Sequence, residues 1–69
     1  MQVEIREGEE FIKLGQLLKK AGLVDSGVEA KIVISEGEVQ VNGEVDTRRG
    51  RKVYPGDEVS FGGDTIQVI

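Results

Sequence analysis

The chain has 69 residues, of which 38% are hydrophobic, carries a net charge of −4, and contains neither cysteine nor histidine. A chain of this length builds one small core, so we expect a single domain over residues 1–69 without a large enclosed active site. The missing thiols and imidazoles exclude disulfides, thiolate metal sites and the usual nucleophiles and bases of neutral pH, and the acidic total disfavours general binding to nucleic acid.

The N-terminal part of the chain predicts one strand and one helix. Val3 and Ile5 alternate with polar residues, which is the period of a half-buried strand. Apolar residues then recur at helical spacing, and this predicts a helix over residues 9–22. The buried face of that helix would carry Phe11, Leu14, Leu18 and Ala21. A polar stripe away from this face holds Lys13, Gln16 and Lys20.

The next segment, residues 26–36, gives conflicting signals. Ser26 and Glu29 have the spacing of a capping box, which predicts the start of a second helix. The β-branched residues 32–34 favour a strand instead, and apolar side chains would lie on opposite sides of a helical wheel. Periodicity therefore leaves two possibilities, a helix that is buried on two sides or a strand.

The second half of the chain predicts two hairpins and an intervening turn. Asn42 and Gly43 interrupt an alternation of valines and suit the positive φ angles of a tight type I′ turn. A Tyr-Pro-Gly-Asp turn follows at residues 54–57, and a second hairpin is predicted around Gly62 and Gly63.

The positive charge is concentrated in one block, residues 48–52, with the sequence RRGRK and a charge of +4. The rest of the chain carries −8, so the acidic total does not describe the field near this block. Such a run is often only a solvated loop. The guanidinium group, however, offers a planar fork of donors that matches phosphate oxygens, and this favours a phosphate-binding loop.

No set of residues meets the requirements of catalysis or of a cofactor or metal site. Asp57 and Glu58 are adjacent and would point to opposite faces of a strand, so they are poor acid–base partners. We therefore expect a protein that is not an enzyme and uses no cofactor or metal. Of the aromatic residues, Phe11 and Phe61 are expected in the core and only Tyr54 could stack on a base. Binding to the shape and backbone of a nucleic acid is the more physical expectation.

An ordered set of residues resembles the alpha-L RNA-binding domain named after small-subunit ribosomal protein S-four. The shared positions are Ser26, Ala30, Val33, Ile34, Gly37, Val39, Val41, Asn42, Gly43, Val53, Gly56 and Asp57. The segments LGQLLKKAG, SGVEAK, VNGEVDTRRGRK and GDEV extend the likeness to the small stand-alone bacterial members over nearly the whole chain. The resemblance implies an α+β fold in which two helices pack on a small, mainly antiparallel sheet with added N- and C-terminal strands. It also makes residues 26–36 the second helix.

The resemblance implies a site for structured RNA, ribosomal or transfer RNA, formed by the first helix, the start of the second and the RRGRK block. Its residues would be Lys13, Gln16, Lys20, Ser26, Lys31, Arg48, Arg49, Arg51 and Lys52. Many family members have Arg-Leu-Asp where this chain reads Lys13-Leu14-Gly15, and Ser-Arg where it reads Ser26-Gly27. Exposed loop charges contribute little to stability, so reversing Arg49 and Arg51 together is expected to abolish RNA binding and preserve the fold.

Two other functions are possible from the sequence. The order of strand, helix and GDEV hairpin is also similar to that of β-grasp sulfur carriers, but Gly62 and Gly63 are internal, whereas carriers are activated at a C-terminal Gly-Gly. A protein-interaction module whose basic loop docks on an acidic partner, such as a ribosome-associated protein, is the other alternative. We expect a monomer without a membrane partner. No apolar run of about 18 residues or signal-peptide core is present, which predicts a soluble, cytoplasmic protein.

Overall fold

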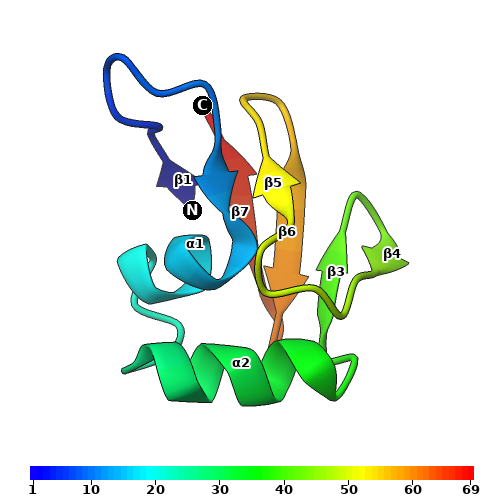
Figure 1. Ribbon diagram of the computed structural model, residues 1–69. Helices are drawn as coiled ribbons and strands as arrows, with labels where there is room; N and C mark the ends of the chain where they lie inside the picture. The colour runs from blue at the N-terminus through cyan, green and yellow to red at the C-terminus, as the bar shows by residue number, and fades with distance from the viewer.

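The computed structural model describes residues 1–69 and contains two helices and seven short strands (Figure 1). The helices are α1 (Leu14–Lys20) and α2 (Gly27–Ser35). The strands are β1 (Gln2–Val3), β2 (Ile12–Lys13), β3 (Val39–Val41), β4 (Glu44–Val45), β5 (Lys52–Val53), β6 (Glu58–Phe61) and β7 (Asp64–Val68). Neither helix is long and apolar enough to cross a membrane.

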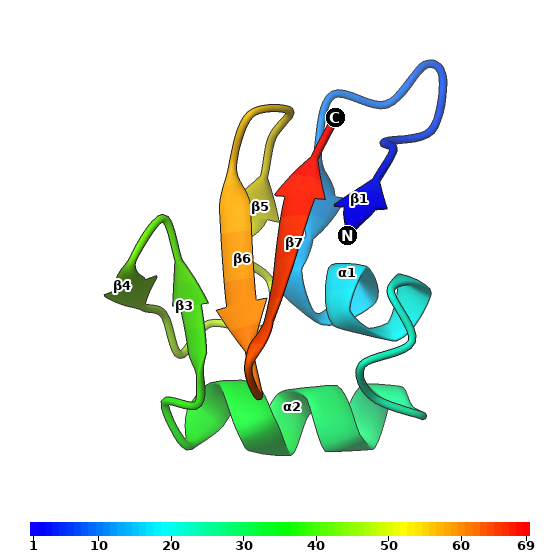
Figure 2. The ribbon, with the colours of Figure 1, turned by 180° about the vertical axis from the view of Figure 1, so that it is seen from behind.

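The strands form two sheets that share one core. A five-stranded sheet has the order β1-β7-β6-β3-β4, and β2 pairs with β5 in a separate two-stranded sheet. All pairs are antiparallel except β1 with β7, which run parallel with Val3 opposite Val68. The first and last strands of the chain are therefore neighbours at one edge of the sheet, as Figure 2 shows from behind. The predicted α+β architecture, with N- and C-terminal strands added to a mainly antiparallel sheet, is confirmed.

The core lies between the helices and the sheets. Figure 1 shows α2 crossing below the ends of β3, β6 and β7, while α1 lies above α2. The largest fully buried side chains come from both helices and from four strands of the two sheets: Leu14, Leu17, Leu18, Ile34, Val39, Val53, Val59, Ile66 and Val68. Most elements contribute an apolar face to this core, whereas both residues of β4 are exposed. The helices and the longer strands therefore depend on one another for stability.

The first helix starts later than predicted. It was expected over residues 9–22, but it begins at Leu14, and the two preceding residues form β2 instead. In β2, Ile12 pairs with Val53 and Lys13 with Lys52, so the backbone groups of this stretch bond to β5. The spacing of Phe11 and Leu14 is helical only by coincidence, because this long-range pairing overrides the local pattern.

The second helix matches its prediction at both ends and resolves the conflict at residues 26–36. Ser26 is the N-cap, and its hydroxyl oxygen accepts a hydrogen bond from the Glu29 amide at 3.2 Å. The Glu29 carboxylate accepts from the Asp25 amide at 3.0 Å, one residue earlier than a capping box requires. Val28 and Ile32 are 68% and 49% exposed, so the helix is buried on one side only.

Both predicted hairpins are confirmed, and the backbone angles of their turns show why asparagine and glycine are needed there. Asn42 and Gly43 have φ values of 52° and 84°, and Gly62 and Gly63 have 59° and 86°. Consecutive positive φ angles are those of the type I′ turn, whose twist matches that of the flanking strands.

Candidate nucleic-acid interface

The basic loop, residues 48–52, is held against the first turn of α1. The backbone amides of Leu14 and Gly15 donate to the carbonyl oxygens of Arg51 and Arg49, at 2.8 and 3.0 Å. These amides have no partner within the helix itself, so the loop supplies the acceptors that the start of a helix requires. Residues from two distant parts of the chain are thereby fixed next to each other.

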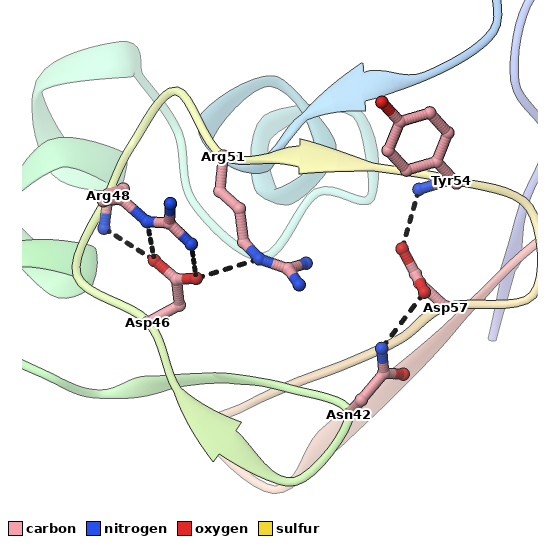
Figure 3. Close-up of polar contacts among 6 residues, drawn as sticks. All are labelled: Asn42, Asp46, Arg48, Arg51, Tyr54 and Asp57. Atoms are coloured by element: carbon pink, nitrogen blue, oxygen red, sulfur yellow. Dashed lines mark hydrogen bonds and ion pairs between the residues drawn. The ribbon is translucent and has the colours of Figure 1, made fainter.

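Asp46 holds two of the three arginines of the basic loop (Figure 3). Its carboxylate accepts hydrogen bonds from Arg48 Nε and Nη2 at 3.1 and 2.8 Å, and it forms an ion pair with Arg51 Nε at 2.9 Å. The Asp46 side chain is only 12% exposed. The hydrogen bond from the Arg48 side chain, against the opposing effect of burial, lowers the pKa of Asp46 from 3.8 to about 2. One carboxylate therefore orients two cations and cancels part of the loop's charge.

Arg51 is partly buried rather than freely exposed. Its side chain is 27% exposed, and its buried Nη1 atom has no hydrogen-bond partner. In Figure 3 its guanidinium group extends from Asp46 toward Asn42 and Asp57. Reversing this charge would leave Asp46 facing a second carboxylate. The premise that the loop charges are exposed is therefore wrong for Arg51, and we expect the Arg49 and Arg51 double substitution to destabilise the fold.

Asn42 and Asp57, two positions of the family likeness, have a structural role. The Asn42 side chain donates to the Asp57 carboxylate at 3.0 Å and accepts from the Glu58 amide at 2.9 Å. Asp57 also accepts from the Tyr54 amide at 2.8 Å. The hydrogen bond from the Tyr54 amide, together with the Asn42 bond and the charge of Arg51, lowers the pKa of Asp57 against the effect of burial. These contacts tie the β3–β4 turn to the β5–β6 turn.

The predicted RNA-binding residues divide into two groups. The first lies at the basic loop and the adjoining sheet, where the register places Lys13 beside Lys52. This group consists of Lys13, Arg48, Arg49, Arg51 and Lys52. All of these side chains except Arg51 are exposed.

No hydrogen bond or ion pair joins the remaining residues, Gln16, Lys20, Ser26 and Lys31, to the basic loop. The Lys20 ammonium donates to the Glu4 carbonyl at 2.8 Å, toward the N-terminal strand. Ser26 caps α2, and Lys31 is exposed on that helix. Gln16 accepts weakly from the Lys13 amide at 3.4 Å. Lys13 itself lies in β2 and not on the first helix, which corrects its predicted position.

Sequence reasoning missed Asp46 and Phe11. Asp46 precedes Arg48 by two residues, and the Arg48 amide bonds to its carboxylate at 3.0 Å, a local turn that the sequence itself could have indicated. Phe11 was expected in the core but is only half-buried, because it precedes β2 and contacts Tyr54 rather than the buried side of a helix. Phe61 is also half-buried, although it packs against the core.

Gly15 is the point of closest approach between α1 and the basic loop. A Cβ atom at this position would lie 2.7 Å from Arg49 Cγ, closer than two carbon atoms can approach. Replacing a helical glycine by alanine normally stabilises a protein by about 1 kcal/mol. Here we expect Gly15→Ala to destabilise by about 1 kcal/mol instead, because the Arg49 side chain must leave its position against α1.

Gly27, in the first turn of α2, is the matched control, because a Cβ atom there would meet nothing within 4 Å. We expect Gly27→Ala to be neutral or to stabilise by about 0.5 kcal/mol. Urea unfolding of both variants measures the difference. Equal effects of the two substitutions would show that the loop does not press on Gly15.

The pH dependence of stability follows from Asp46 and Asp57. A carboxyl group whose pKa is lower in the folded than in the unfolded state adds stability above its unfolded pKa, and this is lost as the pH falls through the folded value. Because the pKa of Asp46 is about 2 in the folded protein, we expect the free energy of unfolding to be constant from pH 7 to 5 and to fall between pH 4 and 2. Urea unfolding across this range tests the prediction, and Asp46→Asn should show a smaller fall.

Comparison with known proteins identifies the family of this chain. The family model of the S4 domain matches residues 3–69, so the chain belongs to the S4 domain family. The solution structure of YbcJ from Escherichia coli, described as revealing an αL motif involved in RNA binding, is similar with a TM-score of 0.73 and 40% identity, covering 99% of this chain and 85% of YbcJ. The predicted family is therefore confirmed, and the β-grasp alternative is not supported.

Two bacterial relatives are similar over most of their length. The Escherichia coli protein named "Putative RNA-binding protein YbcJ" is 47% identical over 58 residues, which are 84% of this chain and 83% of that protein. The Bacillus subtilis protein named "Probable ribosome maturation protein RlbA" is 56% identical over 61 residues, which are 87% of this chain and 86% of that protein. Both have nearly the same extent as this chain, as expected for the small stand-alone members.

Proposed function

We propose that residues 1–69 act as one non-enzymatic module that binds structured RNA, ribosomal or transfer RNA, through phosphate and shape contacts. The observation that carries this proposal is the basic loop fixed against the start of α1 by two backbone hydrogen bonds. A loop that is held in place before binding loses less conformational entropy when phosphates dock on it. The names of the relatives, which refer to RNA binding and to ribosome maturation, support the same function.

Within this site we assign different roles to the cations. Arg49 and Lys52 are exposed and form no ion pair, so they would make the main phosphate contacts, with Lys13 beside Lys52. Arg48 keeps donors free beyond those used by Asp46, while Arg51 mainly holds the loop. Gln16, Lys20, Ser26 and Lys31 are proposed as peripheral contacts that a larger, shaped RNA would reach.

The charge distribution of the protein indicates which kind of RNA it binds. The chain carries −8 outside the basic loop, so an RNA docked in the wrong orientation meets repulsion. This favours a compact, folded RNA over arbitrary single strands. We propose that the protein acts as a monomer on the ribosome or on a ribosome-associated RNA, and therefore in the cytoplasm.

An amide NMR titration tests the function. Structured ribosomal and transfer RNA fragments are added to the labelled protein at low and at physiological salt. We expect shifts concentrated at Lys13 and residues 48–52, weaker ones at the peripheral residues, and a log–log salt slope near −3 to −4 for about four phosphate contacts. An unchanged spectrum at low salt would reject RNA binding and favour a basic loop that docks on an acidic protein.

A further inference from the structure

The outer face of the two-stranded sheet of β2 and β5 carries aromatic rings beside the two lysines, and phosphate binding does not use these rings. Its register pairs Ile12 with Val53 and Lys13 with Lys52. Val53 is fully buried, so the Lys13 and Lys52 side of the sheet faces outward. Alternation along each strand then places Phe11 beside Lys13 and Tyr54 beside Lys52 on this same face.

Contacts among three of these side chains, and the register that places Lys13 opposite Lys52, define one cluster. We call it the aromatic platform: Phe11, Lys13, Lys52 and Tyr54. The rings of Phe11 and Tyr54 have centroids 5.9 Å apart and are tilted by 55°. The Lys52 ammonium lies over the Phe11 ring, 5.0 Å from its centroid. Tyr54 is 45% exposed, and Phe11 is half-buried.

Phe11 and Tyr54 lie outside the core, although the chain has few aromatic residues with which to build one. The chain has two phenylalanines, one tyrosine and no tryptophan, and two of these three rings lie outside the core. Burying a large apolar side chain contributes about 1.5–3 kcal/mol, which a small domain needs. Rings kept at the surface beside lysines are therefore available for a ligand with both an aromatic face and negative charge.

A groove of about 470 Å³ opens directly beside the aromatic platform. Its apolar lining consists of Ile5, Phe11 and Ile12, and its polar lining of Arg6, Glu9, Gln16, Lys19 and Lys20. The one carboxylate, Glu9, is paired with Arg6 at 3.8 Å, so the lysines leave the groove with a net positive charge. This combination suits a nucleotide, since the base requires apolar contact and the phosphate requires a cation. Phe11 belongs to both the groove and the platform, so the two surfaces are continuous at its ring.

We propose that the aromatic platform stacks an unpaired base of the bound RNA, with Lys13 and Lys52 on the phosphates that flank it. The inference rests on the proposed function and specifies its ligand as structured RNA that contains a bulged or loop nucleotide. A base inside a duplex has no free face, so only an unpaired one can stack on a side chain. Lys52 and Tyr54 are about 7 Å apart along the strand, so a phosphate at Lys52 and a base at Tyr54 belong to the same or neighbouring nucleotides.

Two RNA hairpins that differ by a single bulged nucleotide test the proposal. The bulged position carries 2-aminopurine, whose fluorescence is quenched when it stacks on an aromatic ring. We expect the protein to quench this fluorescence and to bind the bulged hairpin more tightly than the fully paired one. Tyr54→Leu and Phe11→Leu should each weaken binding of the bulged hairpin by about 5- to 100-fold and leave the paired hairpin unaffected.

Tyr54→Phe is the matched control, because it keeps the ring and should retain both the quenching and the affinity. An amide NMR spectrum of each variant verifies its fold, and a Phe11→Tyr variant replaces Phe11→Leu if the leucine variant unfolds, with retained quenching expected. Equal binding of both hairpins without quenching overturns the aromatic platform while RNA binding stands. The stacking proposal is also overturned if Tyr54→Leu weakens the binding of both hairpins equally. If the protein binds neither hairpin, the proposed function itself is rejected.

Discussion

Replacing Arg49 and Lys52 together by glutamate is expected to lower the affinity for structured RNA about 100-fold at physiological salt, since a hydrogen bond to a charged group contributes about 1.5–3 kcal/mol. Both side chains are exposed and have no carboxylate partner, so they are available to phosphates. The fold should survive, because neither side chain forms a hydrogen bond or ion pair, and the contact of Lys52 with the Phe11 ring is worth only about 0.5–1 kcal/mol.

The experiment measures the dissociation constant for a ribosomal or transfer RNA fragment at several salt concentrations. Loss of two phosphate contacts should reduce the salt slope by about 2. The control replaces four exposed neutral residues outside the basic loop and the groove, Gln2, Val28, Gln40 and Thr65, by glutamate, which lowers the net charge by the same four units. If both variants lose affinity to the same extent, net charge and not the loop determines binding.

Replacing Asp46 by alanine is expected to lower the free energy of unfolding by about 2 kcal/mol, because the poorly exposed Arg51 guanidinium would lose its only carboxylate partner. For a domain of this size the melting temperature should fall by about 8–16 °C. Removal of Asp46 also frees Arg48, so the loop loses the contacts that orient two of its cations. The effect should therefore be larger than that of an ordinary surface substitution.

Thermal and urea unfolding of the Asp46→Ala variant measure this loss. Asp64→Ala is the matched control, since Asp64 is exposed and forms no ion pair, and its effect should stay within about 0.5 kcal/mol. Stability of Asp46→Ala equal to that of the control would show that the Asp46 contacts do not hold the basic loop. Amide NMR of the same variant reports whether the loop residues alone change or the whole core does.

The local parts of the fold could be predicted from the sequence. The type I′ turn at Asn42 and Gly43 requires positive φ angles that few residues adopt, and Ser26 offers a hydroxyl at the helix start. Alternation predicted the strands on either side of the turns. These features depend on residues within a few positions of one another, so the chain itself specifies them.

The start of the first helix could not be predicted from local sequence patterns. Phe11 and Leu14 have helical spacing, yet the helix begins only at Leu14 because Ile12 and Lys13 pair with a strand some 40 residues later. The RNA-binding site is affected in the same way. Lys13 was placed on the helix, whereas it lies beside Lys52 on the outer face of a sheet.

The sequence pattern by itself determined the hairpins, the cap at Ser26 and the concentration of positive charge at residues 48–52, whereas the fold class and the choice of a helix for residues 26–36 came from the family resemblance. Only the tertiary structure decided which of those charges are available, because Asp46 holds Arg48 and Arg51 while Arg49 and Lys52 stay exposed. It also decided that Phe11 and Tyr54 meet at the surface. The physical reason is that ion pairs and ring contacts depend on distances between segments far apart in the chain, which local periodicity does not encode.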